Sequence, residues 1–416
     1  MIALRVLLIA PKDSYRIPAY VESASQNGIE ILIASQGQHS LVSSIAQGLQ
    51  IDLDDLHLSV EIIAREARNG PFRGVIATDD STTEIASRTA LRLNLAHNPP
   101  EAVRIARRKD LAREALRNAS LAVPEFRLID LHRPLSNQMV DFPFPCVVKP
   151  LAMSGSRGVI RCDNLDQFHD AARRVEAIIA EEVDESERRK LLVEAFIPGF
   201  EVAVEGMLSE AQLEILAIFD KPDPLDGPYF EESYYISPTR LAETVQEQIR
   251  DQVEQACRAY GLVDGPIHAE CRVNAQGVWM LELAARTIGG LCSRLFRYGV
   301  GYSLEELVLR HAIGVELKRP EITVGAGVLM IPIPKAGVLR RVEGTVEAAR
   351  VPFIQEVVIQ VRDGYELIPL PEGASYLGFI FAVAPSAEQA ERALRNAHAC
   401  LNIVVAPLWK GVVASA

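Results

Sequence analysis

Two β-strands and the tight turn between them are predicted by the segment Gly265-Pro-Ile-His-Ala-Glu-Cys-Arg-Val-Asn-Ala-Gln-Gly-Val-Trp-Met-Leu-Glu-Leu-Ala-Ala-Arg286. The turn falls at 274–277 and ends in a glycine that can adopt a positive φ. An odd number of loop residues would place Glu270 directly opposite Glu282, where like charges destabilise a hairpin. Strand alternation puts Arg286 on the same face as Glu282.

Two carboxylates and an arginine on one strand face call for a compensating ligand. A divalent cation with a phosphate would supply it, because Mg²⁺ is usually held by one or two carboxylates together with phosphate oxygens. The alternative is a pair of exposed acids on an edge hairpin. The rest of the chain favours the cation site.

Length and composition predict a globular protein of two or three domains, because a chain of 416 residues is too long to fold around a single compact core. The net charge of −12 argues against a nucleic-acid or anionic-membrane partner. Six cysteines without CxxC spacing predict buried free thiols in a reducing compartment. The apolar start, Met1 to Ala10, lacks a cleavage pattern and reads as a buried strand. No apolar run reaches the roughly 20 residues of a membrane span, so we expect a cytoplasmic protein.

Residues 1–97 alternate apolar strands with amphipathic helices, which predicts a doubly wound parallel sheet. No GxGxxG follows the first strand, so the dinucleotide fingerprint is absent. The loop at Pro11 to Tyr15 and the turn Asp79-Asp80-Ser81 follow strands, where open sheets bind ligands; a helix cap is the alternative for the turn. The expected strands are Leu4 to Ala10, Ile29 to Ala34 and Gly74 to Thr78, and the expected helices Ile17 to Asn27, Leu56 to Asn69 and Ile85 to Leu93.

The remaining chain divides into a central domain, residues 98–320, and a C-terminal α+β lobe, residues 321–416. The central domain opens with a basic helix, Glu101 to Asn118, and contains a small α+β subdomain at about 143–208. The C-terminal lobe is expected to be antiparallel. Its predicted strands are Ala326 to Ile333, Gln355 to Gln360 and Leu377 to Val383, followed by a helix at Ser386 to Leu401.

A lysine at the end of a buried strand marks the segment 144–159. Lys149 is costly on such a strand unless it meets an anion. The loop that follows contains Ser154 and Ser156 among glycines, so its N–H and hydroxyl groups can turn toward phosphate oxygens. It is not a Walker A loop, and a flexible surface hairpin is the alternative.

Another strand, Leu191 to Glu201, breaks at Pro198-Gly199. Backbone groups beyond Glu194 could pair with the edge of an adenine, and Glu194 or Glu201 could accept hydrogen bonds from its amino group or from a ribose. Any exposed strand end offers similar groups, so this segment by itself is weak evidence for a nucleotide site.

In this order and spacing the segments resemble the ATP-grasp superfamily over nearly the whole chain. The resemblance rests on Arg108-Lys109-Asp110, the Val-Val-Lys149-Pro strand, Val-Glu194-Ala-Phe-Ile-Pro-Gly-Phe-Glu201 and the pair Glu270 and Glu282 with Arg286. It implies an ATP-grasp fold with an N-terminal α/β domain and a closing C-terminal lobe.

The resemblance also implies a role for each matching residue. Lys109, Lys149, Ser154 and Ser156 would contact the nucleotide phosphates. Glu194 and the backbone from Ala195 to Ile197 would hold the adenine, and Glu201 the ribose. Glu270 and Glu282 would bind Mg²⁺ or Mn²⁺, and Arg286 would contact the transferring phosphate.

One position departs from the superfamily pattern, because Ala284 stands where many members have an asparagine that is a further metal ligand. The run from His268 through Arg286 to Gly289-Gly290 is instead similar to the L-amino-acid ligase branch, which forms dipeptides. That similarity implies substrate contacts at Gly289 and Gly290. His268 could orient a substrate carboxylate or phosphate, and a structural histidine is the alternative.

The activity implied is ATP-dependent joining of a small-molecule carboxylate to an amine, most simply of two amino acids. The carboxylate would take the γ-phosphate to give an acyl phosphate, and the amine would then displace phosphate. The alternatives are a carboxylase or purine-pathway ligase using bicarbonate or formate, and a non-catalytic ATP-binding protein. By analogy with the fold, a homodimer is expected.

Overall fold

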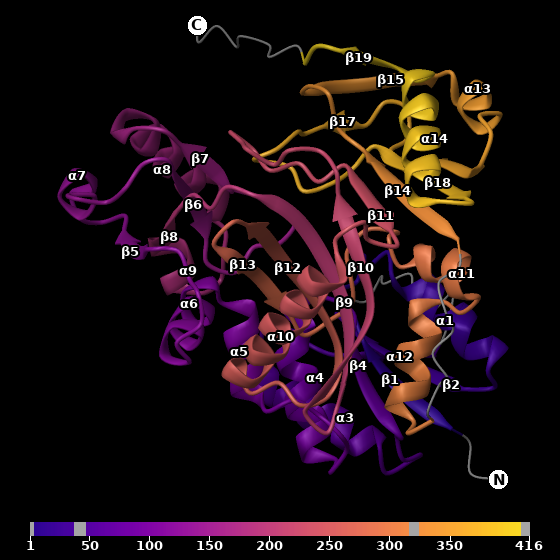
Figure 1. Cartoon of the computed structure of the whole chain (residues 1–416). Helices are drawn as coiled ribbons and strands as arrows, with labels where there is room; N and C mark the ends of the chain where they lie inside the picture. The colour runs from indigo at the N-terminus through magenta and orange to yellow at the C-terminus, as the bar shows by residue number, and fades with distance from the viewer. Residues whose placement is uncertain (1–3, 37–46, 316–323, 409–416) are drawn as a thin grey trace, which may run out of the picture. The chain divides into compact units, whose positions relative to one another are not determined.

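The computed structural model describes residues 4–36, 47–315 and 324–408. The chain divides into two compact units, each built from three separate segments. Figure 1 labels the helices and strands along the chain. Unit 1 comprises residues 1–123, 202–218 and 241–322, and unit 2 comprises residues 124–201, 219–240 and 323–416. The division into domains 1–97, 98–320 and 321–416 stays a prediction.

A four-stranded parallel sheet in the order β3-β2-β1-β4 forms the N-terminal part of unit 1. The apolar run at the start of the chain becomes its buried strand β1, as predicted. The elements of this part are β1 (Arg5–Ile9), α1 (Ile17–Gln26), β2 (Glu30–Ser35), β3 (Gln47–Gln50), α3 (Leu56–Glu66), β4 (Gly74–Ala77), α4 (Asp80–Arg92), α5 (Pro100–Arg107) and α6 (Lys109–Asn118).

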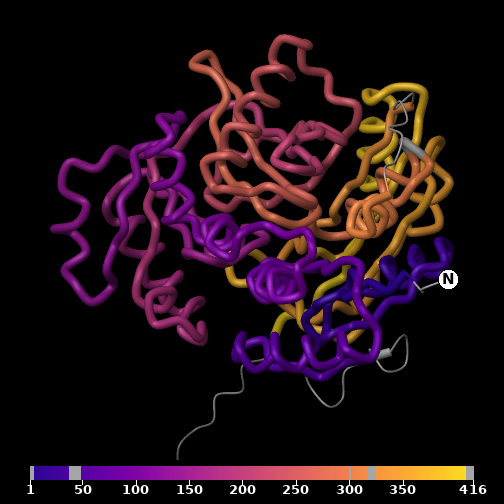
Figure 2. Tube along the Cα trace, turned by 90° about the horizontal axis from the view of Figure 1, so that it is seen from below, coloured from indigo at the N-terminus to yellow at the C-terminus, as the bar shows by residue number. Residues whose placement is uncertain are grey.

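Alternating side chains of β1 enter two separate cores, as expected for a sheet covered on both faces. Val6 and Leu8 pack in a cluster with residues of α1 and of α12 (Leu304–Ala312). Leu7 and Ile9 pack in the other cluster with residues of α3 and α4. Helix α1 packs against α12, and Figure 2 shows the indigo N-terminal segment beside orange chain. The first and last segments of unit 1 therefore lie side by side.

The second sheet of unit 1 follows the order β13-β12-β9-β10, and helix α10 packs against β13. Strands β9 and β10 continue past the boundaries at 201/202 and 218/219, so their outer ends belong to unit 2. The elements are β9 (Phe200–Ser209), β10 (Gln212–Lys221), α10 (Glu243–Tyr260), β12 (Gly265–Asn274), β13 (Gly277–Ala284) and α11 (Arg294–Val300).

Unit 2 contains a small sheet in the order β5-β8-β6-β7, covered by helix α8. Phe168, Ala172 and Val175 of α8 are fully buried against Cys146 and Val148 of β6. The elements are β5 (Phe126–Asp130), α7 (Leu135–Gln138), β6 (Cys146–Pro150), β7 (Ile160–Cys162), α8 (Leu165–Ile179), α9 (Glu185–Arg189) and β8 (Lys190–Ala195).

The C-terminal part of unit 2 is antiparallel, with strands ordered β11-β14-β18-β16 and helix α14 packed against them. A smaller sheet follows the order β17-β15-β19. The elements are β11 (Tyr234–Ser237), β14 (Gly325–Ile331), β15 (Gly337–Glu343), α13 (Thr345–Ala349), β16 (Ile354–Ile359), β17 (Glu366–Leu367), β18 (Gly378–Ala384), α14 (Ala387–Ala399) and β19 (Asn402–Ala406).

The predicted fold class is confirmed, with a parallel sheet at the N-terminus and antiparallel sheets elsewhere. The single basic helix expected at Glu101 to Asn118 is wrong, because the structure has two helices that meet at Arg108. Arg108 is extended (φ −100°, ψ 107°), and its guanidinium forms two 3.0 Å hydrogen bonds with Asp110 in the first turn of α6.

Two predictions drawn from composition can be compared with the described residues. All six cysteines are free; five are buried, and Cys400 is half-buried. In the part of the chain that the structure describes, helices are too short or too polar to cross a membrane.

Candidate active site

Glu270 and Glu282 lie directly opposite each other across the β12–β13 hairpin, as predicted. The loop, however, has an even number of residues, because Asn274 pairs with Gly277 and leaves two residues in the turn. The register shifts by one residue between Cys271 and Glu270, which is a β-bulge. The predicted opposition of the two carboxylates is therefore produced by the bulge and not by the loop.

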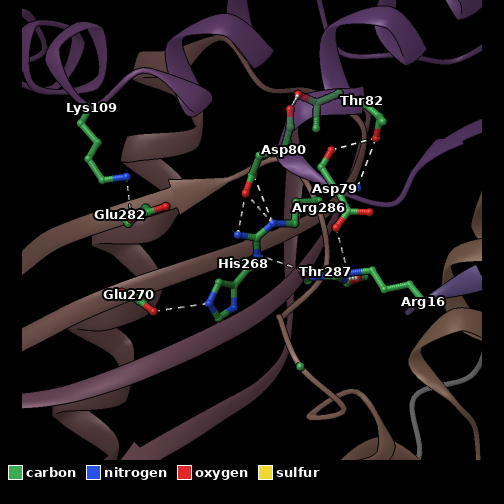
Figure 3. Close-up of polar contacts among 12 residues, drawn as sticks. Arg16, Asp79, Asp80, Thr82, Lys109, His268, Glu270, Glu282, Arg286 and Thr287 are labelled. Atoms are coloured by element: carbon green, nitrogen blue, oxygen red, sulfur yellow. Dashed lines mark hydrogen bonds and ion pairs between the residues drawn. The ribbon is translucent and has the colours of Figure 1, made fainter. Parts of the chain in front are cut away.

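Each glutamate of the pair has a cationic neighbour (Figure 3). Lys109 Nζ, at the first residue of α6, lies 3.3 Å from Glu282 Oε2. His268 Nε2 lies 3.6 Å from Glu270 Oε1. The Glu270 and Glu282 side chains are 20% and 29% exposed, so a ligand could reach both.

His268 is held by a buried carboxylate on the neighbouring strand β9. Its Nδ1 lies 2.5 Å from Oε1 of Glu205, whose side chain is fully buried. Burial opposes charge on both groups: it raises the pKa of Glu205 and by itself would lower that of His268. The attraction of Glu205 outweighs that penalty at His268 and, with Glu270, raises its pKa to about 9. The contact with Glu205 and the upward direction of this pKa shift favour positive charge on His268.

Arg286 forms a bidentate ion pair with Asp80, the first residue of α4. The Nη2–Oδ2 distance is 2.9 Å, and Nη1 donates to the Thr287 carbonyl at 3.0 Å. Burial alone would raise the pKa of the Asp80 carboxyl, but Arg286 lowers it below its usual value. Among the described residues these contacts engage three of the five guanidinium N–H groups. The other two N–H groups have no hydrogen-bond partner among the described residues.

The turn after Arg286 contacts the loop that follows β1, one of the two strand ends singled out in the sequence. Arg16 donates from Nη1 to both Thr287 Oγ1, at 2.7 Å, and the Thr287 carbonyl, at 3.1 Å. The Gly290 N–H donates to the Tyr15 hydroxyl at 2.7 Å. A Cβ on Gly289 would lie 3.9 Å from the Tyr15 hydroxyl. The two glycines predicted to contact substrate therefore border an aromatic and cationic loop.

In unit 2, Lys149 and Glu194 form an ion pair on one face of the β6–β8 ladder. Val147 pairs with Glu194, and Lys149 pairs with Leu192, so the two charged side chains are diagonal neighbours. Lys149 Nζ lies 2.6 Å from Glu194 Oε2. The side chains are 13% and 3% exposed. The buried strand lysine has its anion within the protein.

The loop after Lys149 presents a partly exposed run of small residues. Ser154 is exposed, and Ser156 is half-buried with a positive φ of 56°. Gly158 has a φ of +71°, and a Cβ there would lie 2.7 Å from Pro150 Cγ, so only glycine fits. Its N–H donates to the Pro371 carbonyl at 2.9 Å, and Arg157 Nε donates to the Glu372 carbonyl at 3.0 Å.

The strand end predicted to hold an adenine is already part of the unit 2 hydrogen-bond pattern. The Ala195 N–H donates to the Glu125 carbonyl at 2.8 Å, and Ile197, two residues later, is buried. Glu201 lies 2.8 Å from the buried amine of Lys221, which also contacts Glu232. The predicted ribose ligand therefore belongs to a buried ion-pair cluster.

The arrangement of Glu270 and Glu282 fits a divalent cation. Two opposed carboxylates destabilise a hairpin unless a positive charge offsets them, and both oxygens are partly exposed. Ala284 pairs with His268 and is buried, so its side chain supplies no ligand atom.

The structure brings the predicted residues together in two groups, one in each unit. Unit 1 contains Lys109, His268, Glu270, Glu282, Arg286, Gly289 and Gly290. Unit 2 contains Lys149, Ser154, Ser156, Glu194, Ala195, Ile197 and Glu201.

Sequence reasoning missed the partners of these residues: Asp80 as the Arg286 partner, and Glu205 and Lys221 altogether. A usable signal existed for the last two, because Glu205 lies among apolar residues of β9 and Lys221 ends the largely apolar strand β10.

Comparisons with known proteins identify two domain families in the chain and a solved structure of similar fold. Residues 142–294 match the ATP-grasp domain family, and residues 329–406 match the family described as L-amino acid ligase C-terminal domain 2. The crystal structure of L-amino acid ligase from Bacillus licheniformis has a similar fold, with a TM-score of 0.85 and 24% identity, over 98% of this chain and 100% of that chain.

Two curated relatives are similar in sequence. The uncharacterized protein y4rH of Sinorhizobium fredii is 24% identical over 86% of this chain and 73% of its own length. Dapdiamide A synthase of Enterobacter agglomerans is 27% identical over 38% of this chain and 37% of its own length, so that match is partial. The chain therefore contains an ATP-grasp domain followed by a C-terminal domain of the L-amino acid ligase type, and it shares the fold of that ligase over almost its full length.

Proposed function

We propose that this protein is an ATP-dependent ligase that joins a carboxylate to an amine, with amino acids as substrates. The observation that carries the proposal is the β12–β13 hairpin, which presents two opposed carboxylates beside Lys109 and Arg286. The L-amino acid ligase type of the C-terminal domain supports amino acids over bicarbonate or formate.

The proposed reaction has two steps. A carboxylate oxygen of the first substrate attacks the γ-phosphorus of ATP, and the bond to the β-phosphate oxygen breaks, which gives an acyl phosphate and ADP. The nitrogen of the second substrate then attacks the acyl carbon. The C–O bond to phosphate breaks and the amine loses a proton, which leaves an amide and inorganic phosphate.

In this proposal cationic side chains contact the transferring phosphate, and the glutamate pair binds the divalent cation. Glu270 and Glu282 would hold Mg²⁺, which neutralises phosphate charge when bound. Lys109 and Arg286 would contact the transferring phosphate, and the two remaining N–H groups of Arg286 would stabilise the oxyanion of the second step. His268 would contribute positive charge beside Glu270.

The nucleotide itself is assigned to unit 2. Lys149 and the hydroxyls of Ser154 and Ser156 would contact the phosphates. Glu194 and the backbone from Ala195 to Ile197 would hold the adenine, and Glu201 the ribose. The substrates would lie against Gly289 and Gly290, where Tyr15 and Arg16 offer a hydroxyl and a cation to a substrate carboxylate.

The proposal includes a cytoplasmic location, small-molecule partners without nucleic acid, and a homodimer. The acidic net charge and the free thiols support the first two. Light scattering after size exclusion would test the homodimer, and a monomer mass would contradict it.

The decisive experiment measures phosphate release with Mg-ATP against pairs of the twenty L-amino acids, with mass analysis of the products. Phosphate release matched by a dipeptide mass establishes the reaction and names the substrates. ATP binding without ADP or phosphate release, across that set and a broader set of carboxylates and amines, would favour a non-catalytic ATP-binding protein.

A further inference from the structure

The face on which Glu282 lies depends on a single extra residue in β13. Near the turn the pairs are regular: Asn274 with Gly277, and onward to Cys271 with Met280. The next pair is Glu270 with Glu282, so Leu281 has no partner in the ladder. Leu281 is the bulge residue.

Without the bulge, the glutamates would not share a face. Continuing the regular register would pair Glu270 with Leu281 and Ala269 with Glu282. Opposed residues lie on one face and successive residues alternate, so Glu282 would then point away from Glu270. The bulge is therefore required to bring the two carboxylates together.

A buried arginine on helix α6 binds the backbone at this bulge. Arg113 Nη2 donates to the Leu281 carbonyl at 2.8 Å. The Arg113 side chain is only 2% exposed and is among the largest fully buried side chains described. A bulge disrupts the local ladder, and a hydrogen bond from a charged donor is about twice as strong as a neutral one. Arg113 therefore stabilises the carbonyl of the residue that sets the register.

The same helix face carries Lys109, one turn before Arg113. Lys109 contacts the Glu282 carboxylate, while Arg113 contacts the backbone of the preceding residue. Helix α6 thus holds Glu282 at two points, one on the side chain and one on the main chain.

We propose that Arg113 is a positioning residue for the glutamate pair, holding the Leu281 bulge that keeps Glu282 on the face of Glu270. The inference rests on the proposed role of the two glutamates as metal ligands. Arg113 itself touches neither substrate nor cation in this proposal. Its effect is on the metal affinity of the hairpin.

The test is Mn²⁺ binding, measured by electron paramagnetic resonance with a non-hydrolysable ATP analogue, so it does not depend on turnover. Arg113→Met keeps the apolar stem and removes the donor. We expect its Mn²⁺ dissociation constant to rise about 10- to 100-fold, as for other groups that orient metal ligands. Arg113→Lys, which keeps one charged donor, should bind more tightly than Arg113→Met.

Arg117→Met is the matched control, because Arg117 is on the same helix, is exposed, and pairs with Glu114 of that helix. It should bind Mn²⁺ like the wild-type chain. A folded Arg113→Met variant with wild-type Mn²⁺ affinity would overturn the inference while leaving the proposed function intact. A wild-type chain that binds Mn²⁺ and forms no amide would overturn the function and leave the Arg113 comparison valid.

Deletion of Leu281 provides a second test, because it removes the bulge through which Arg113 is proposed to act. The deletion places Glu282 opposite Glu270 in a regular ladder, so the bulge carbonyl no longer exists. In that background Arg113→Met should change Mn²⁺ affinity by less than about twofold, since the coupled contact is gone. If Arg113→Met lowers Mn²⁺ affinity as much in the deletion variant as in the chain that keeps Leu281, Arg113 acts at another place.

Discussion

The two units present lysine and glutamate side chains in opposite ways. On the unit 2 ladder, Lys149 and Glu194 are diagonal neighbours 2.6 Å apart, and their charges cancel within one sheet. On the unit 1 hairpin, Glu270 and Glu282 have the same charge and oppose each other directly. Their cationic neighbours are Lys109, from another element, and the ion-paired His268.

This difference indicates what each group requires from a ligand. The unit 1 pair carries like charges that a divalent cation would offset, so binding should stabilise the hairpin. In the unit 2 pair the two charges offset each other, so in the proposed site a nucleotide phosphate would compete with Glu194 for Lys149. Four substitutions test this contrast.

The largest effect is expected when the like-charged pair loses one member. Glu282→Gln should lower metal-dependent phosphate release by about 10³-fold, because a bound cation contributes several kcal/mol to charge stabilisation. The metal-free chain should unfold at nearly the same temperature, because the substitution removes both the like-charge contact with Glu270 and the attraction to Lys109. Glu247→Gln, an exposed glutamate of α10, is the control. Near-wild-type activity of Glu282→Gln would remove the metal assignment.

A smaller effect is expected from breaking the ion pair between Arg286 and Asp80 in unit 1. Asp80→Asn should lower the free energy of unfolding at neutral pH by about 2–3 kcal/mol, below the range for fully buried pairs because Asp80 is 19% exposed. Arg286 lowers the folded-state pKa of Asp80, so its contribution is present above the unfolded pKa near 3.9 and is lost as pH falls toward the folded value. Denaturant titrations at pH 7 and pH 3 should show the difference between variant and wild type shrinking at pH 3. An equal difference at both values would contradict the ion-pair account.

The self-balanced pair of unit 2 is tested by Lys149→Ala. Losing one charged hydrogen bond to phosphate should raise the KM for ATP about 10- to 100-fold. Lys335→Ala, an exposed lysine of the same unit, should leave it unchanged. An unaltered KM in Lys149→Ala would move the phosphate contact to another residue.

The smallest effect is expected at an exposed pair of unit 2. Arg174 Nη2 lies 2.8 Å from Glu372 Oε2, with both side chains 41% exposed. Glu372→Gln should therefore lower the free energy of unfolding by less than about 1 kcal/mol. Calorimetry of the variant beside Lys149→Ala compares an exposed and a buried pair within one unit. A loss above 2 kcal/mol would mean that this contact does more than an ordinary surface pair.

Much of the fold could be predicted, because alternating apolar strands and helices are local patterns. The break at Arg108 could not, since no glycine or proline marks it and the Arg108–Asp110 pair becomes visible only in the structure. Strands β15 and β19 were not predicted, and neither were the short strands β3, of four residues, and β17, of two residues. Brief strands carry too few residues for a period to show.

In the candidate site, too, local patterns could be predicted from the sequence and long-range contacts could not. Residue types and spacing along the hairpin predicted the glutamate pair, and the register was right although the bulge was not foreseen. The partners were not predictable in the same way. Asp80 is 206 residues from Arg286 and Glu205 is 63 residues from His268, and only the tertiary fold brings such pairs together.

The three-segment composition of each unit has a consequence for biosynthesis. The last segment of unit 1 ends at residue 322, whereas unit 2 needs chain that is translated only after residue 323. A ribosome therefore delivers everything that unit 1 requires while unit 2 still lacks strands β14, β16 and β18. During that interval strand β11 lacks its antiparallel partner β14, whereas the sheet of β5, β8, β6 and β7 is already complete. A stall late in translation would expose the free edge of β11 to aggregation.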